Sequence, residues 1–426
     1  MKSFLKRVGV FIDKNIIYFL FGFGILALLP YITVFSGLEI QNTGSMVYRG
    51  ILFSLFFVVF IVELIVSKII PNKCIIIGCS VYLITQTITL FASPVIKNVD
   101  IPIIQSLSGL ATAFISVLTV FVAYTFLTSR KKDHERNNIV CYALLGIGVA
   151  ACLYSYIFQY KQISEVLTNE HGWNYQVTSV FTTKGVYGFV LLITSISTVI
   201  LALNTKKYWF YAFAVFFLFN SFLCRAKYSI LFIFIILIAV LIYHLIKDYK
   251  KHEKIWNITL GISAGVIVIL CLFTFIPLLN FGPFEKINYF IKNTIFNDGI
   301  TVMKDRYFKS ANIIKAVDYP LGVLFGCGEK IANYILAPNA EVRGDDLYVD
   351  TYAYGGLIKV ILYLAFIAFV LYKVIKTKGE YKAFSILFTV IIVLSGMFAE
   401  NSIIGFNLTF LFMAPFIYML PFQEEN

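Results

Sequence analysis

Residues 208–246 read YWFYAFAVFFLFNSFLCRAKYSILFIFIILIAVLIYHLI, an apolar run that is broken only by the tetrapeptide Cys224-Arg-Ala-Lys227. An α-helix crosses the hydrocarbon core of a bilayer with about 20 residues. This run is too long for one crossing and suits two. We therefore expect a helical hairpin that turns near Arg225, and the pattern indicates an all-α membrane protein.

The composition of the whole chain supports this interpretation. Apolar residues make up 59% of the 426 residues, charged residues make up 14%, and the mean hydropathy is +0.84, whereas a soluble domain is roughly 25% charged. We expect a polytopic protein that forms a single membrane domain over residues 1–426, with about twelve transmembrane helices. The predicted spans are residues 15–35, 50–67, 74–93, 102–128, 138–160, 181–203, 208–224, 228–246, 256–279, 354–375, 382–399 and 402–420.

Basic residues in the short loops predict the orientation of these spans, because such residues gather on the cytoplasmic side. With the N-terminus inside, the cytoplasmic segments carry Lys2, Lys6, Arg7 and Lys14; Lys68 and Lys73; Arg130, Lys131, Lys132 and Arg136; Lys206 and Lys207; Lys247, Lys250, Lys251 and Lys254; Lys373, Lys376, Lys378 and Lys382. Both termini are then cytoplasmic. Most of the net charge of +12 follows from this topology, and no nucleic-acid partner is expected because no basic soluble face is present.

One long polar stretch interrupts the apolar pattern. Residues 281–352 lie between the ninth and tenth predicted spans and form an extracytoplasmic loop in this topology. Loops longer than about 15 residues are usually functional or disordered. Since this loop keeps aromatic and aliphatic residues throughout, we expect it to be partly helical, to fold against the membrane domain and to carry the chemistry.

Several classes of site are excluded by what the sequence lacks. No Walker motif or dinucleotide-binding glycine pattern occurs, the seven cysteines form no CxxC pair, and the four histidines are too scattered for a metal site. We predict no metal and no cofactor. The classes of function that remain are chemistry and transport at the outer face of the membrane.

Five cationic residues are predicted to gather at that face: Lys184, Arg225, Lys227, Arg306 and Arg343. A charge at membrane depth is costly unless it lines a wet cavity or meets an anion, and a guanidinium suits bidentate binding of phosphate. Together these residues fit a diphosphate head group. The alternative is that the lysines extend to solvent and carry no function.

The loop also contains a pair of acidic residues, Asp345 and Asp346, close to Arg343. A carboxylate beside guanidinium groups stays ionised and can accept a proton from a hydroxyl group, which is worth about a hundred- to ten-thousandfold in rate. The alternative is an exposed acidic turn in which Gly344 supplies a permissive backbone.

The order of these features resembles the superfamily of O-antigen ligases and Wzy-type O-antigen or capsule repeat-unit polymerases. The similar segments are Phe181-Thr-Thr-Lys-Gly-Val-Tyr-Gly188, Arg225, Arg306-Tyr-Phe-Lys-Ser-Ala311, Pro320-Leu-Gly-Val-Leu-Phe-Gly-Cys-Gly328, Asp345-Asp-Leu-Tyr348 and Gly355-Gly356. Two departures matter: Asp345 occupies the position of the ligase's catalytic histidine, and Asp346 stands where Asn is usual. The loss of the histidine favours a polymerase.

The resemblance implies a membrane glycosyltransferase of the bacterial plasma membrane whose substrates are glycans on undecaprenyl diphosphate. Arg306, Asp345 and Asp346 would be catalytic, Lys184, Arg225, Lys227 and Arg343 would bind the diphosphate, and Tyr307 and Tyr348 would contact sugars. Membrane lipids and a chain-length regulator are the further partners that it implies. Two alternatives stay open: a ligase that moves a finished glycan to another acceptor, and a flippase for the same lipid-linked oligosaccharides.

Overall fold

The structure of the protein is a computed structural model whose described residues are 88% helical, which confirms the all-α prediction. The described residues are 2–29, 32–35, 51–66 and 100–114 with gaps, 73–98, 134–168, 176–249 except 182, 311–328 with gaps, 347–376 and 381–395. The predicted spans at 256–279 and 402–420 therefore lie outside the described residues, as does most of the loop 281–352.

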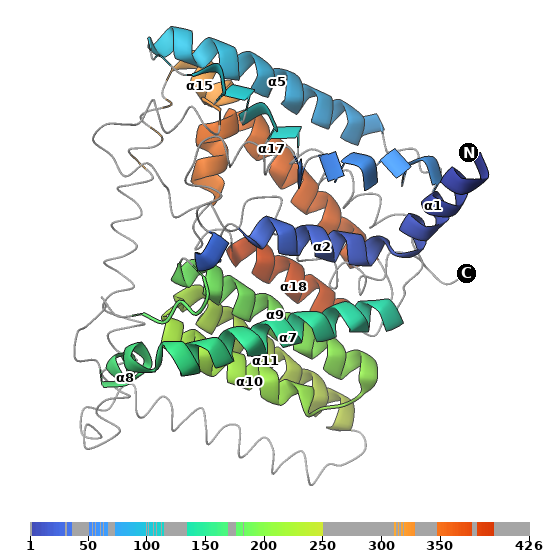
Figure 1. Ribbon diagram of the computed structural model, residues 1–426, viewed down its shortest axis with the longest axis vertical. Coiled ribbons are helices and arrows are strands. Elements are labelled where there is room, and N and C mark those ends of the chain that lie inside the picture. Colours follow the sequence, from blue (N-terminus) through green and yellow to red (C-terminus); the bar gives the residue numbers. More distant parts are fainter. Residues whose placement is uncertain are drawn as a thin grey trace. The chain divides into compact units, whose positions relative to one another are not determined.

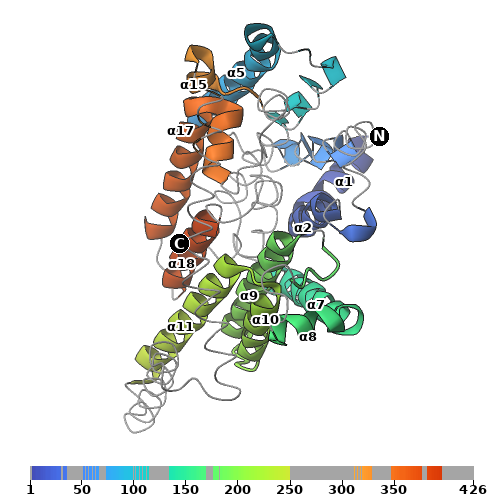
Figure 2. The same cartoon turned by 90° about the vertical axis from the view of Figure 1, so that its left-hand side faces the viewer.

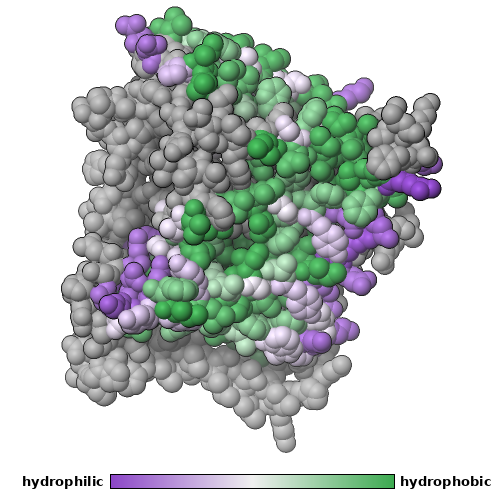
Figure 3. All heavy atoms as spheres, in the orientation of Figure 1, coloured by the Kyte–Doolittle hydropathy of each residue, from purple (hydrophilic) through white to green (hydrophobic). Residues whose placement is uncertain are grey.

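Within this part of the chain, four helices are long and apolar enough to cross a membrane: Glu135–Phe158, Lys184–Thr205, Lys227–Lys247 and Thr351–Lys376. The bent pair Lys6–Lys14 and Ile16–Leu26 would make a fifth. Many large apolar side chains are exposed, and Figure 3 shows broad hydrophobic areas on the face turned to the viewer. The membrane character predicted from the composition agrees with these helices.

The chain divides into two compact units, of which unit 1 comprises residues 1–141 and 306–426 and unit 2 comprises residues 142–305. Unit 1 contains α1 (Lys2–Lys14), α2 (Ile16–Leu28), the short 3₁₀ helix η2 (Thr33–Phe35), α5 (Lys73–Lys97), α15 (Pro320–Phe325), α17 (Leu347–Lys376) and α18 (Lys382–Ser395). Unit 2 contains most of α7 (His134–Phe158), α8 (Tyr160–Thr168), α9 (Lys184–Thr205), α10 (Phe210–Cys224) and α11 (Lys227–Tyr249). Figures 1 and 2 show both sets of helices.

Helix α9 is the centre of unit 2. It packs against α10 and α11, and every residue from Val186 to Leu203 is buried. Its hydroxyl side chains are satisfied within the helix, since Thr194, Ser195 and Ser197 each donate to the carbonyl four residues earlier, at 2.7–2.9 Å. Such bonds allow a helix to enclose hydroxyl groups away from water.

The predicted hairpin at Arg225 is confirmed. Helix α10 ends at Cys224, α11 begins at Lys227, and Arg225 adopts the left-handed conformation with φ 55° and ψ 30°. At the turn, the hydroxyls of Ser221 and Ser229 are 2.8 Å apart. At the far end, the Tyr211 hydroxyl lies 3.0 Å from Nε2 of His244, so the two helices run antiparallel.

In unit 1, α5 packs against both α15 and α17, and α18 packs against α17. Helix α17 is longer than the predicted span 354–375 because it consists of two helical pieces that meet at Gly356, whose φ of 61° and ψ of −165° are not helical. This combination of a positive φ with an extended ψ is adopted almost only by glycine. The glycine pair that the sequence places at the start of this span therefore marks a break within a longer helix.

Candidate functional site

Three cationic residues lie at helix ends that adjoin one another in unit 2, and we call Lys184, Arg225 and Lys227 the helix-end cation cluster. Lys184 is the first residue of α9, Arg225 caps the C-terminus of α10, and Lys227 is the first residue of α11. The turn of the hairpin thus lies beside the start of α9. Lys184 is also close enough to the Cys224 thiol to act on it electrostatically. The structure brings together these three predicted residues.

The turn of the hairpin is seated directly on α9. The Tyr228 hydroxyl donates a hydrogen bond to the carbonyl oxygen of Gly185, at 2.5 Å. A Cβ atom on Gly188 would overlap the Cβ of Ala226, so only glycine allows this approach. Arg225, which directly precedes Ala226, is 3% exposed.

The segment before α9 holds the position of Lys184. The side chain of Gln159 bonds to both backbone groups of Ser179, accepting from the nitrogen at 2.9 Å and donating to the carbonyl oxygen at 3.1 Å. The Ser179 hydroxyl donates to the carbonyl of Ala151 on α7 at 2.6 Å. The Thr183 side chain then caps α9 by accepting a hydrogen bond from the nitrogen of Val186 at 3.3 Å, as is typical of an N-cap threonine.

The helix-end cation cluster combines cationic residues with two helix N-termini. The N-terminus of an α-helix carries a partial positive charge, and both α9 and α11 begin with a lysine and have no acidic residue in the first turn. Arg225 is almost fully buried, and the ammonium nitrogen of Lys227 is buried as well. Buried cations beside two helix N-termini form an arrangement that suits an anion such as phosphate.

A second feature lies in unit 1, where the segment 320–328 interlocks with the break in α17. The nitrogen of Cys327 donates to the carbonyl of Ala353 at 2.9 Å, and the nitrogen of Gly328 donates to the carbonyl of Tyr354 at 3.0 Å. A Cβ on Gly326 would overlap the backbone of Tyr354 and Gly355, and a Cβ on Gly356 would overlap the backbone of Leu324 and Phe325. Gly326 and Gly356 thus allow the backbone of segment 320–328 to pack directly against the backbone of α17.

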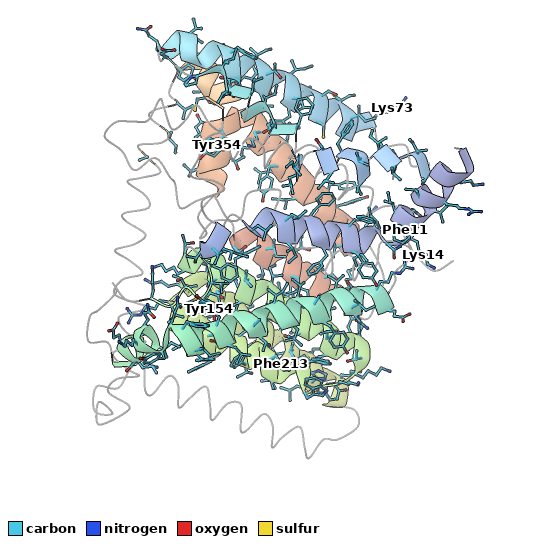
Figure 4. The ribbon with its side chains drawn as sticks, viewed as in Figure 1. Phe11, Lys14, Lys73, Tyr154, Phe213 and Tyr354 are labelled. Atoms are coloured by element: carbon cyan, nitrogen blue, oxygen red, sulfur yellow. The ribbon has the colours of Figure 1, made fainter. Side chains whose placement is uncertain are left out.

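This interlock is held from α5 as well. The buried side chain of Gln86 donates to the carbonyl of Phe325 at 3.4 Å. Lys359 of α17 places its ammonium over two aromatic rings, at 5.5 Å from the centre of Tyr82 and 5.9 Å from the centre of Tyr354. Figure 4 labels Tyr354 at the end of α17 beside α15.

Lys359 and Gln86 were not predicted as functional residues. A usable signal exists in the sequence, because a lysine or glutamine within an apolar span is rare and usually has a specific partner. Lys359 follows the glycine pair by only three residues, and its aliphatic stem covers Gly355. The sequence alone could not reveal that the ammonium lies between two tyrosines from different helices.

The remaining predicted site residues fall outside the described part of the structure, either wholly or in their side chains. Arg306, Tyr307, Arg343, Asp345 and Asp346 lie outside the described residues. Tyr348 lies in the first turn of α17, but its side chain is outside the described part. The described residues contain no group of three or more His, Cys, Asp or Glu side chains that could hold a metal ion.

Comparisons of the chain with protein-family models, curated proteins and solved structures gave no match.

Proposed function

We propose that the protein is a polysaccharide repeat-unit polymerase, a membrane glycosyltransferase similar to the Wzy-type polymerases. It transfers a growing glycan from undecaprenyl diphosphate to a lipid-linked repeat unit. The observation that carries the proposal is the helix-end cation cluster, in which the buried Arg225 is separated from the start of α11 only by Ala226, which contacts α9. A diphosphate group on a lipid is the anion that fits a cationic site at the end of a membrane helix bundle.

In the proposed reaction, a hydroxyl oxygen of the acceptor sugar attacks the anomeric carbon of the donor glycan. The bond between that carbon and the diphosphate oxygen breaks, and undecaprenyl diphosphate leaves with the bonding electrons. Asp345 or Asp346 takes the proton of the hydroxyl group. Arg225, Lys184 and Lys227, with Arg306 and Arg343 from the loop, stabilise the negative charge that develops on the leaving diphosphate.

In this proposal the protein crosses the bacterial plasma membrane with about twelve transmembrane helices and keeps both termini in the cytoplasm. The loop 281–352 and the reaction lie on the extracytoplasmic side, where no nucleotide is needed because the diphosphate leaving group is already activated. The interlock of segment 320–328 with α17 supports this arrangement, since it ties part of the loop to the start of a membrane helix. Tyr307 and Tyr348 contact sugars in this proposal.

The direct test uses the purified full-length protein in detergent with the undecaprenyl-diphosphate repeat unit from the native cells. A polymerase produces a ladder of longer lipid-linked glycans from this single substrate. If labelled lipid instead exchanges between the leaflets of liposomes and no ladder forms, the protein is a flippase. If a glycan block appears only on an acceptor that carries no diphosphate, it is a ligase.

A further inference from the structure

Helix α1 has one face packed within unit 1. Gly9 and Ile12 are buried, and Gly9 lies so close to Val62 and Val66 that an added Cβ would come within 2.5 Å of Cγ2 of Val66. This face fixes the rotation of α1 about its own axis. The side chains on the other face are therefore held outward.

The outward face combines three cations with two large apolar residues. Lys6, Arg7 and Lys14 are exposed, and Val10 and Phe11 are 52% and 61% exposed. Figure 4 shows Phe11 and Lys14 together near the junction of α1 and α2. A helix of low net hydrophobicity that carries both Lys or Arg and exposed large apolar residues suits the membrane interface, where long basic side chains reach the phosphates while apolar side chains insert.

The bend between α1 and α2 gives α1 the orientation that such a role needs. The two helices meet at 72°, and Asn15 closes the end of α1 by donating from Nδ2 to the carbonyl of Phe11 at 2.8 Å. Phe11 also packs edge to face on Phe19 of α2, with ring centres 6.5 Å apart. Helix α2 carries no charged residue. When α2 lies along the bilayer normal, the bend places α1 close to the plane of the membrane surface, and α1 is then not part of the span that α2 begins.

We propose that α1 is an interfacial helix that binds anionic phospholipids. The cationic side chains of Lys6, Arg7 and Lys14 contact the lipid phosphates, while Val10 and Phe11 insert between the head groups. Charge complementarity selects this occupant, since anionic lipids attract basic segments that adjoin the first membrane helix. This surface is separate from the helix-end cation cluster and does not depend on glycan transfer.

The test is amide hydrogen exchange on the full-length protein in two kinds of lipid nanodisc, one of phosphatidylcholine alone and one with about a third phosphatidylglycerol. We expect the amides of residues 6–14 to exchange at least about threefold more slowly with phosphatidylglycerol. Raising NaCl to about 0.5 M should abolish this difference, because salt screens exposed charges. The amides of α2 report whether the protein remains inserted.

Two sets of variants separate charge from packing. Lys6→Gln, Arg7→Gln and Lys14→Gln together should remove the dependence on phosphatidylglycerol, whereas the control Lys73→Gln, Lys161→Gln and Lys207→Gln removes three exposed lysines elsewhere and should keep it. Val10→Ser with Phe11→Ser should speed exchange in both lipids. Equal exchange of α1 in the two lipids would overturn the proposal. So would a lipid effect that survives the loss of the three α1 charges.

Discussion

Gly188 of α9 lies directly against Ala226, the residue between Arg225 and Lys227, with no room for a Cβ on the glycine. The methyl group of Ala226 fills the space that any side chain at residue 188 would need. Because Ala226 connects two members of the helix-end cation cluster, this contact controls where both cations lie. It links the packing of the membrane helices to the geometry of the candidate site.

Replacing Gly188 by Ala should displace the hairpin turn from α9. We expect a loss of about 1–3 kcal/mol in the free energy of unfolding, as for other overpacked cores, and a shorter glycan ladder. Thermal unfolding in detergent and the polymerase assay measure the two effects. Adding Ala226→Gly moves the methyl group from one helix to the other and should restore much of the ladder. A double variant no better than Gly188→Ala would show that this contact does not position the cluster.

Gly146 of α7 provides the control for that substitution. A Cβ at this position meets no atom within 4 Å. Gly146→Ala should therefore leave the ladder unchanged and raise stability by up to about 1 kcal/mol, because alanine favours a helix over glycine. The comparison separates a general effect of adding a methyl group from the specific overlap at Gly188.

Arg225→Gln should reduce glycan transfer by about a hundredfold, the usual effect of removing one group that stabilises transition-state charge. Lys206→Gln is a matched control, because Lys206 also caps a helix in the left-handed conformation, with φ 57° against 55° for Arg225, but it is exposed. Initial rates with the native lipid-linked repeat unit give the comparison. Equal rates for the two variants would remove Arg225 from the mechanism.

Gly356→Ala should disrupt the interlock between segment 320–328 and α17. The substitution places a side chain in a backbone region that is essentially restricted to glycine, which costs about 1–3 kcal/mol, and drives its Cβ into the backbone of Leu324 and Phe325. We expect faster proteolysis near residues 320–328 and a lower unfolding temperature. Gly22→Ala in α2, where the Cβ meets open space, should change neither measurement.

Lys359→Met should weaken the contact between α5 and α17. Methionine keeps the aliphatic stem over Gly355 but loses the attraction to the rings of Tyr82 and Tyr354, worth about 0.5–1 kcal/mol for each pair. Lys359→Arg keeps the cation and should retain most of the stability. In a Tyr82→Leu background, the same Lys359→Met change should have a smaller effect on the unfolding temperature. An undiminished effect there would show that Tyr82 does not hold the ammonium.

The sequence was sufficient to predict the class of fold and one detailed element. Hydrophobicity and length determine whether a segment can cross a bilayer, and both are read directly from composition. For the same reason the hairpin at Arg225 could be predicted, since a charged tetrapeptide between two apolar runs leaves few other arrangements. In the structure, the turn of this hairpin packs on α9, and Lys184 at the start of α9 therefore lies near Arg225 and Lys227.

Other features depend on contacts between distant segments and could not be predicted. The glycine pair at 355–356 predicts a permissive backbone, but the sequence does not say that Gly356 breaks a helix and receives the backbone of Leu324 and Phe325. The same holds for Lys359, whose partner Tyr82 is far away in the chain. Such pairs are determined by packing, and hydropathy carries no information about them.

The interlock at Gly326 and Gly356 has a consequence for how this chain can diverge. Its two ties to α17 join main-chain atoms, from Cys327 to Ala353 and from Gly328 to Tyr354. Mutation can therefore exchange the side chains along both segments while the ties persist, provided that the glycines remain. Among relatives that retain this interlock, we expect the spacing of its glycines to be conserved after most of the surrounding sequence has changed.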